Sequence, residues 1–429
     1  MKRTLGLILA AVLLGGCSPS SQIVDVTDVQ YEPVEQTPQA EALPTPSPTP
    51  GPYVTEDIFV VECEDGINLR ESSSSKSDLI GTLLPGDRVK VLGYQSQRFA
   101  RVQLDNGQIG YAIAGYLKVE DYAAFGLEVV QPVEKYSYEQ MLQDLDALAA
   151  QYPSLCFLES AGQSLEGREL QVIVIGDVEA PHHVFVQGSI HAREHMTALL
   201  CTALAERLLQ QGGEAEVCFH ILPMTNPDGV TIQQGETMPE SILEIYTSDG
   251  EKGLSVDTGT VYLSQWQANA RGVDLNRNFD ALWENIDTTQ APSFMNYRGE
   301  APESEPETQA LVAYTDRYAF DATLSYHATG SAIYWEFGED PAVNAASMHL
   351  AEAIKEVSAY EPLGDSGDSF GGYKDWAMLQ RKIPSVTIEV GTRTAPLTEA
   401  EFSNVFFRNR DVLPAVAEWV RSSKTKAAF

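Results

Sequence analysis

Residues 183–209 read HVFVQGSIHAREHMTALLCTALAERLL. The stretch begins with an apolar run that is typical of a buried strand, and its second apolar run, Ala198 to Leu209, predicts a helix. Between these two elements, His191 and Glu194 are three positions apart. On a helical turn this spacing puts both side chains on one face, where an imidazole and a carboxylate can bind one metal ion.

The rest of the region 130–425 continues the alternation of strands and helices. Apolar runs predict the strands, and apolar residues at helical spacing predict the helices. The predicted strands are 170–175, 217–222, 322–326 and 385–390, the predicted helices include one near 141–148 and one at about 409–421, and 226–229 is expected to be a turn. This pattern indicates an α/β fold.

Other polar residues occupy positions where chemistry is expected. His327 follows a predicted strand, and Glu389 lies inside an otherwise apolar one. An acidic residue is rarely buried in such a strand without a function. The segment Gly272–Phe279 reads GVDLNRNF and contains Asn276 and Arg277. A lone His-x-x-Glu pair arises often by chance and is weak evidence for a metal site. The additional polar residues strengthen the metal-site prediction.

Taken in order, the motifs HARE, NPDG, GVDLNRNF, SYH and TIEVG resemble the metallocarboxypeptidase family of carboxypeptidase A. The resemblance covers about residues 130–425 and implies a mixed central sheet flanked by helices, with one Zn²⁺ ion per chain. It implies that His191, Glu194 and His327 bind the zinc ion. It also implies that Glu389 activates the zinc-bound water.

The same resemblance assigns substrate-binding roles. Asn276 and Arg277 are expected to hold the free carboxylate of the substrate, since a guanidinium can grip a carboxylate through two parallel hydrogen bonds. Animal members have an oxyanion-stabilising Arg soon after a Trp. Here Gln267 stands near that place, and Arg271 is expected to take over the catalytic role. Arg193 either touches substrate or forms a structural ion pair.

The segment GGYKDW, residues 371–376, is similar to bacterial members of the family that cleave γ-D-glutamyl-diaminopimelate bonds in cell-wall peptides. In the family, the residue two before this Trp lies at the floor of the pocket for the C-terminal side chain. Here that residue is Lys374, which would favour an acidic side chain and would be left unpaired by an apolar one. The alternative is a lysine exposed to solvent.

The N-terminus predicts export and anchoring. A short apolar run, Leu5–Leu14, follows two basic residues and is too short to cross a bilayer. It leads into Leu14-Gly15-Gly16-Cys17, which resembles a bacterial lipobox. The resemblance implies that residues 1–17 are a lipoprotein signal peptide with its lipobox, and that Cys17 carries the lipid. We therefore expect the mature protein on the extracytoplasmic face of the cell membrane.

Two segments follow the lipobox. Residues 18–56 are rich in proline and serine, which favours an extended polyproline tether. Residues 57–120 contain short alternating runs separated by turns, among them Asn106-Gly107, which predicts a hairpin. The motifs INLR, GTLLPGDRVKVLG and GQIGYAIAGYL resemble a bacterial SH3 domain and imply a small all-β SH3-like barrel. Such a domain either binds cell-wall peptides or acts as a spacer.

Composition restricts the partners. The chain has 61 acidic against 28 Lys and Arg residues, a formal net charge of −33, which argues against nucleic acid as a partner. The four cysteines after Cys17 lack paired CxxC spacing, which argues against a cysteine-based zinc site. They allow three full disulfide pairings, among which the sequence does not choose, and buried free thiols are the default expectation. The remaining histidines are expected to be core or surface residues; they include His182, His183, His220 and His349.

These inferences favour an extracytoplasmic zinc metallocarboxypeptidase that hydrolyses cell-wall stem peptides of the γ-D-glutamyl-diaminopimelate type. A general carboxypeptidase for peptides with acidic C-termini is the first alternative. A catalytically inactive wall-binding lipoprotein is the second. The presence of His191, Glu194, His327 and Glu389 together argues against an inactive protein.

Overall fold

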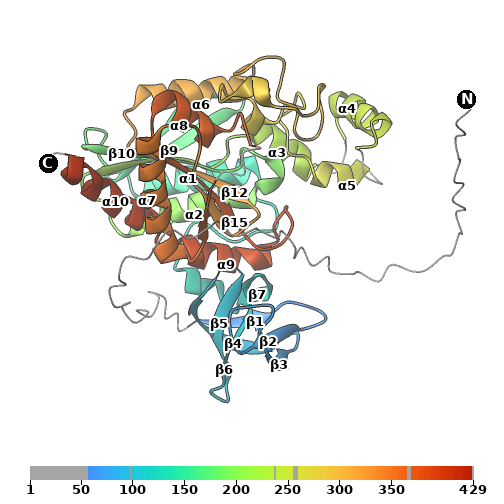
Figure 1. Ribbon diagram of the computed structural model, residues 1–429, viewed down its shortest axis with the longest axis vertical. Coiled ribbons are helices and arrows are strands. Elements are labelled where there is room, and N and C mark those ends of the chain that lie inside the picture. The colour runs from blue at the N-terminus through green and yellow to red at the C-terminus, as the bar shows by residue number, and fades with distance from the viewer. Residues whose placement is uncertain (1–56, 97, 236–237, 255–258, 365–368, 428–429) are drawn as a thin grey trace, which may run out of the picture. The chain divides into compact units, whose positions relative to one another are not determined.

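The computed structural model describes residues 57–427 apart from 97, 236–237, 255–258 and 365–368. The described residues form a small antiparallel sheet and a larger mixed sheet that is covered by helices (Figure 1). The predicted signal peptide with Cys17 and the tether at 18–56 lie outside the described residues. The α/β fold and the preceding all-β region agree with the sequence-based expectation.

The small sheet contains seven strands in the order β3-β2-β6-β5-β4-β1-β7 among the described residues. Its core follows from the alternating pattern: in β4, Val89 and Val91 are buried while Arg88 is exposed. The predicted hairpin turn at Asn106-Gly107 joins β5 to β6, which pair in antiparallel fashion. The strands are β1 Ile58–Val61, β2 Ile67–Arg70, β3 Leu79–Leu83, β4 Arg88–Tyr94, β5 Phe99–Gln103, β6 Ile109–Ile113 and β7 Leu117–Val119.

The larger sheet has eight strands in the described part of the chain, in the order β14-β13-β15-β12-β10-β11-β9-β8. Its centre is parallel, from β15 through β12 and β10 to β11, and both edges include antiparallel pairs. The central strands are buried on both faces, which explains their continuous apolar sequences. The strands are β8 Cys156–Gln163, β9 Glu169–Ile175, β10 His182–Gln187, β11 Val217–Leu222, β12 Ala322–Ala328, β13 Ala332–Tyr334, β14 Glu361–Leu363 and β15 Ser385–Val390.

Helices cover the larger sheet on both faces (Figure 1). Buried apolar residues of α1, α2, α9 and α10 pack into one apolar core, those of α6 and α8 pack into another, and α7 contributes to both. The helices are α1 Tyr138–Gln151, α2 Met196–Gln210, α3 Pro227–Gln234, α4 Glu240–Glu251, α5 Gly259–Ser264, α6 Pro306–Arg317, α7 Pro341–Ser358, α8 Tyr373–Arg381, α9 Glu399–Asn409 and α10 Val412–Ala427. Short 3₁₀ helices η1 to η5 occupy Ala114–Tyr116, Tyr122–Phe125, Ala192–Glu194, Leu275–Arg277 and Trp283–Asn285.

The structure corrects two sequence-based element predictions. The segment at 226–229 is the start of α3, because the Asn226 side chain accepts a hydrogen bond from the Gly229 amide and Pro227 fits the first helical turn. The helix predicted at about 409–421 corresponds to α10, which begins at Val412 and extends to Ala427, and the separate helix α9, which ends at Asn409, was not predicted.

Helix α9 also joins the small sheet to the larger one. The rings of Phe59 and Phe125 lie 5.5 Å from that of Phe407, and the Val119 amide donates to the Ser403 hydroxyl at 3.1 Å. In the same helix, the Glu401 carboxylate accepts hydrogen bonds from the amides of residues 392 and 393, just past the end of β15. The small domain therefore packs on a helix that holds the loop after a central strand.

Two further expectations concern membrane crossing and thiols. Among the residues that the structure describes, none of the helices has both the length and the apolar character that a bilayer span requires. The four described cysteines are free: Cys156, Cys201 and Cys218 are buried and Cys63 is half-buried. The structure therefore agrees with the expected free thiols.

Candidate metal centre and substrate pocket

The turn after β10 brings His191 and Glu194 together. A Cβ atom at Gly188 would lie 2.9 Å from the carbonyl oxygen of Thr197, so only glycine fits this close approach to α2. His191 then precedes the 3₁₀ helix η3, in which Glu194 is the last residue. The Nδ1 atom of His191 lies 2.9 Å from Oε1 of Glu194. The two side chains therefore meet across one tight turn, as their spacing predicts.

Strand β12 supplies His327. This strand extends to Ala328, so His327 lies within it and next to β10 in the sheet. Its Nδ1 atom is 3.1 Å from Oε2 of Glu194, and its ring centroid is 4.8 Å from that of His191. One ligand atom from each of the three residues lies within 4.8 Å of the others. The fold thus gathers two imidazoles and a carboxylate at the carboxyl edge of parallel strands.

Asp274 lies directly behind His191. Its Oδ1 atom is 3.2 Å from His191 Nε2, and it also accepts hydrogen bonds from the amides of Asn276 and Asn296. Such a carboxylate fixes the orientation of a metal-binding histidine. The sequence analysis missed this role, although Asp274 opens the DLNRNF run of a quoted motif.

The charges at this centre require a cation between the carboxylates. Burial by itself would lower the pKa of His191, but Glu194 and Asp274 raise it to about 10. Burial would likewise raise the pKa of Glu194, yet His191 and His327 hold it far below its usual range. The two carboxylates therefore favour a positive charge beside His191, and a bound metal ion would supply one.

The residues fit a zinc ion. Two imidazole nitrogens and one carboxylate form a ligand set that catalytic zinc sites use, with a fourth position left for water. Beside them, the buried Oε2 atom of Glu389 has no hydrogen-bond partner among the residues that the structure describes. Glu389 lines the same cavity as His191 and His327. An unsatisfied carboxylate oxygen next to the open position is what a water-activating base requires.

Glu389 is placed by strand pairing. It lies opposite His327 in the parallel pair of β12 and β15. Burial, with the nearby negative charge of Glu194, raises the pKa of Glu389 to about 8, while the charges of His191 and Arg193 oppose this shift. Glu389 therefore holds a proton more readily than an ordinary carboxylate does.

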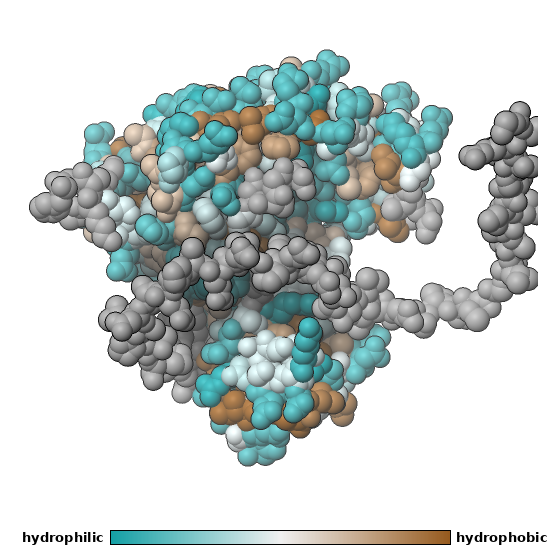
Figure 2. All heavy atoms as spheres, viewed as in Figure 1, coloured by the Kyte–Doolittle hydropathy of each residue, from teal (hydrophilic) through white to brown (hydrophobic). Residues whose placement is uncertain are grey.

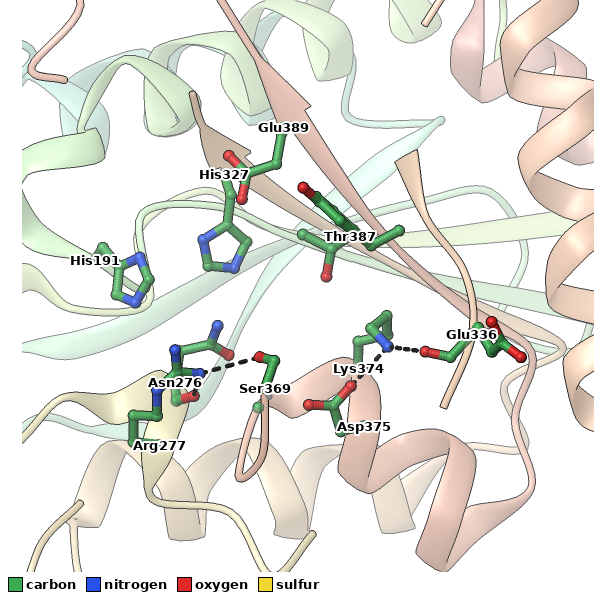
Figure 3. Close-up of a pocket in the computed structure, with 12 residues that line it drawn as sticks. His191, Asn276, Arg277, His327, Glu336, Ser369, Lys374, Asp375, Thr387 and Glu389 are labelled. Atoms are coloured by element: carbon green, nitrogen blue, oxygen red, sulfur yellow. Dashed lines mark hydrogen bonds and ion pairs between the residues drawn. The ribbon is translucent and has the colours of Figure 1, made fainter. Parts of the chain in front are cut away.

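The cavity continues from the metal centre toward α8, and Figure 3 shows its lining residues. Asn276 and Arg277 come from the 3₁₀ helix η4, whose bend places both side chains on the cavity wall. The Asn276 side-chain oxygen accepts a hydrogen bond from the Tyr373 amide, and Arg277 donates to the Ser369 hydroxyl at 3.3 Å. The structure therefore brings both predicted carboxylate-binding residues beside the candidate zinc ligands.

Lys374 lies at the far end of this cavity, where it is 9% exposed, which excludes the solvent-exposed alternative. Its Nζ atom is 2.6 Å from Oδ1 of Asp375 and donates to the carbonyl oxygen of Glu336 at 2.9 Å (Figure 3). The expectation that an apolar substrate would leave this lysine unpaired needs correction, because Asp375 already balances its charge. The sequence analysis overlooked Asp375, the next residue in GGYKDW.

Residues 141–418 match the zinc carboxypeptidase family, and residues 65–118 match the bacterial SH3 domain family. The chain belongs to the zinc carboxypeptidase family. Its relatives include the γ-D-glutamyl-L-diamino acid endopeptidase 1 of Lysinibacillus sphaericus, which is 31% identical over 65% of this chain and 71% of that protein. Carboxypeptidase B of Helicoverpa zea is 28% identical over 51% of this chain and 50% of its own.

The fold of this zinc carboxypeptidase resembles solved members of the family. Carboxypeptidase A from Helicoverpa armigera superposes with a TM-score of 0.54 at 20% identity and covers 86% of this chain and 98% of its own. Thrombin-activatable fibrinolysis inhibitor gives a TM-score of 0.54 at 19% identity, over 67% of this chain and 78% of that one. These structures show the fold, and the family match shows that the protein is a zinc-dependent peptidase, as the sequence predicts.

Arg271 and Arg193, the two arginines considered for roles in catalysis or substrate contact, lie at different distances from the metal centre. Arg271 is 52% exposed at its side chain, forms an ion pair with Glu305 at 3.4 Å, and is not among the described residues that line the cavity. Arg193 donates to Gln265 at 3.1 Å, and its positive charge lowers the pKa of Glu389. The structure thus separates Arg271 from the metal centre and brings Arg193 near it.

Proposed function

We propose that this zinc carboxypeptidase hydrolyses cell-wall stem peptides at bonds of the γ-D-glutamyl-diaminopimelate type. The observation that carries the proposal is the buried pair of Lys374 and Asp375 in the cavity that Asn276 and Arg277 also line. The name of the Lysinibacillus sphaericus relative supports it, since that protein is described as acting on γ-D-glutamyl-L-diamino acid bonds.

In the proposed mechanism, His191, Glu194 and His327 hold the zinc ion. When bound, a zinc ion would polarise the substrate carbonyl and bring the pKa of a bound water near neutrality. Glu389 would take a proton from the attacking water and pass it to the leaving amine, because its buried Oε2 atom has no hydrogen-bond partner among the described residues. The Asp274 carboxylate keeps the His191 ring oriented by a hydrogen bond with the Nε2 atom of that ring.

Asn276 and Arg277 bind a main-chain carboxylate of the substrate in this proposal. The Arg277 guanidinium has weak existing partners, with contacts of 3.3 to 3.5 Å to Ser369 and to the carbonyl oxygens of Asn276 and Phe370. A substrate carboxylate can replace such contacts with shorter, charge-assisted ones.

The Lys374–Asp375 pair selects the substrate side chain. A side chain that ends in one carboxylate would meet both a positive and a negative group there. The side chain of diaminopimelate ends in an ammonium and a carboxylate on one carbon, so each charge has a partner. The pair therefore favours the diamino acid over Glu, and it argues against a general carboxypeptidase for acidic C-termini.

For the oxyanion we propose Arg193 in place of Arg271. A donor for developing charge must lie beside the reacting carbonyl. Arg193 is close enough to Glu389 to lower its pKa, and its buried Nε atom lacks a hydrogen-bond partner in the described part of the chain. Arg271 is held at the surface by Glu305.

We further propose that Cys17 carries a lipid and that the protein acts at the extracytoplasmic face of the cell membrane. The lipobox and the proline-rich tether support this location. The SH3-like domain contributes an apolar surface around β3 and β6 (Figure 2), and its exposed large side chains are Leu79, Ile80, Leu84 and Ile109. Such a surface is suited to hold the wall while the catalytic domain cuts.

Digestion of defined muropeptides tests the function. The purified protein is incubated with a stem peptide that contains the γ-D-glutamyl-diaminopimelate bond and with ordinary peptides ending in Glu, Leu or Phe. Mass spectrometry identifies the products, and Glu389→Gln protein provides the blank. We expect cleavage of the stem peptide at that bond. Faster cleavage of the ordinary peptides would refute the cell-wall assignment while leaving the peptidase intact.

A further inference from the structure

A second group of metal-binding side chains lies on the larger sheet, away from the carboxyl edge that carries His191. His183 is the second residue of β10, and Cys218 and His220 are alternate residues of the neighbouring strand β11. Alternate residues of a strand point to the same face, and His183 pairs directly with Cys218 in the parallel register. All three side chains therefore meet on one face of the sheet.

The ligand atoms are close enough to share one ion. The Nδ1 atom of His183 is 3.0 Å from Nε2 of His220, and one ligand atom of each of the three residues lies within 4.8 Å of the others. Two nitrogens on a tetrahedral zinc ion are about 3.3 Å apart, given zinc–nitrogen distances of about 2.0–2.1 Å. The two imidazoles need to separate by only a few tenths of an ångström.

A hydrogen-bond chain prepares His220 as a ligand. The Tyr314 hydroxyl donates to the Glu159 carboxylate, so it is free to accept the proton of His220 Nδ1, which lies 2.8 Å away. That arrangement leaves the lone pair of His220 Nε2 pointing at His183. Metal-bound histidines are commonly oriented in this way through their second nitrogen.

The surroundings are enclosed but have one open side. Cys218 and His220 are fully buried, and the ring of Tyr318 packs on that of His220, with the two centroids 4.2 Å apart. His183 is half-buried, so an ion can enter past its ring. A thiol and two imidazoles in such a site suit a borderline or soft ion such as Zn²⁺.

We propose that His183, Cys218 and His220 form a second transition-metal site, separate from the catalytic centre. Zinc binds through His183 Nδ1, His220 Nε2 and the Cys218 sulfur. The proton on His183 Nδ1 that faces His220 moves through water to His183 Nε2, and the Cys218 thiol loses its proton to water as the metal–sulfur bond forms. A small ligand such as water completes the tetrahedron. The ion links β10 to β11, and β10 leads directly to His191.

Cobalt substitution tests this proposal with a signal of its own. The full chain is stripped of metal with a chelator and titrated with Co²⁺ while the near-ultraviolet spectrum is recorded. The catalytic ligands His191, Glu194 and His327 include no thiol, so a thiolate-to-cobalt charge-transfer band reports the second site alone. We expect two equivalents of Co²⁺ to bind, one of them with this band.

Variants assign the band. Cys218→Ser should remove the band and one equivalent of metal while peptidase activity remains, and His183→Gln, at a partly exposed position, should do the same. Cys63→Ser, a change at a half-buried thiol in the small domain, should keep both equivalents and the band. Glu194→Gln should abolish activity but keep the band.

Two results would overturn the second site. One is a wild-type spectrum without a thiolate band at two equivalents of Co²⁺. The other is a band that survives in both Cys218→Ser and His183→Gln. Either result leaves the peptidase assignment untouched, because that assignment depends on the equivalent without thiolate character.

Discussion

His327 and Glu389 lie opposite each other on the neighbouring parallel strands β12 and β15. Strand pairing fixes the distance between the two residues. Both the candidate zinc ligand and the candidate base lie on paired strands, and neither depends on a loop for its position. The loop after β15 is in turn fastened by the Glu401 carboxylate of α9. Side chains on paired strands are positioned more accurately than those on loops, which suits a reaction that needs an exact proton path.

Replacement of Glu389 by Gln should lower turnover by about 10²–10⁴-fold, since an amide cannot accept the proton of the attacking water. Zinc content should stay at the wild-type level, because Glu389 is not among the proposed ligands. The measurement is kcat on a muropeptide together with metal analysis, and Glu300→Gln at an exposed position is the control. Retention of most of the activity would show that another group is the base.

Replacement of Asp274 by Ala should weaken zinc binding by about 10–100-fold, because His191 would lose the partner that orients its ring. Competition with a chromogenic chelator measures the affinity. Asp280→Asn changes an exposed acid six residues away and should leave the affinity unchanged. An unaltered affinity in Asp274→Ala would mean that the hydrogen bond to His191 does not support the metal.

Changes at Lys374 and Asp375 should alter substrate choice in opposite ways. Asp375→Asn should improve cleavage before Glu relative to diaminopimelate, because the negative group that opposes a lone carboxylate is gone. Lys374→Met should favour cleavage of the Leu substrate over the Glu and diaminopimelate substrates. A substrate that leaves a polar group without a partner typically loses about 10²-fold in kcat/KM. Values of kcat/KM for the three substrates give the ratios. Lys382→Met, just past the end of α8, is the control, and ratios that match wild type in both pocket variants would exclude this pair from the pocket.

Arg193 and Arg271 can be separated by kinetics. Arg193→Ala should lower kcat by about 10²–10³-fold if its guanidinium stabilises the oxyanion. Arg271→Ala should change kcat little, because Arg271 is half-exposed and paired with Glu305. The reverse outcome would restore the role that the sequence resemblance gave to Arg271.

Membrane anchoring depends on Cys17. Cys17→Ser should prevent lipidation, so the protein should be found in the soluble fraction or as unprocessed precursor. Cell fractionation and metabolic labelling with a fatty-acid analogue measure this, and Cys63→Ser serves as the matched control. If Cys17→Ser protein matures and fractionates like wild type, the lipobox interpretation is wrong.

Much of the fold could be read from local sequence. Buried parallel strands appear as continuous apolar runs, so β11 at 217–222 and β15 at 385–390 were predicted with the bounds that the structure has. Boundaries set by side-chain capping were less visible. Asn226 and Pro227 are common in turns as well as at helix starts. The hydrogen bond that the Gly229 amide donates to the Asn226 side chain marks this segment as a helix start, and the sequence does not show that bond.

The sequence by itself determined the ligand types of the metal centre and the candidate base, because HARE and SYH carry the ligands, and TIEVG the base, each within one local element. Only the tertiary structure decided which charges face one another. It placed Asp274 behind His191, Asp375 beside Lys374, and His183 against Cys218 and His220. Sequence spacing reports neighbours along one helix or strand, whereas these contacts arise when a turn, a helix start or a parallel register brings separate side chains together.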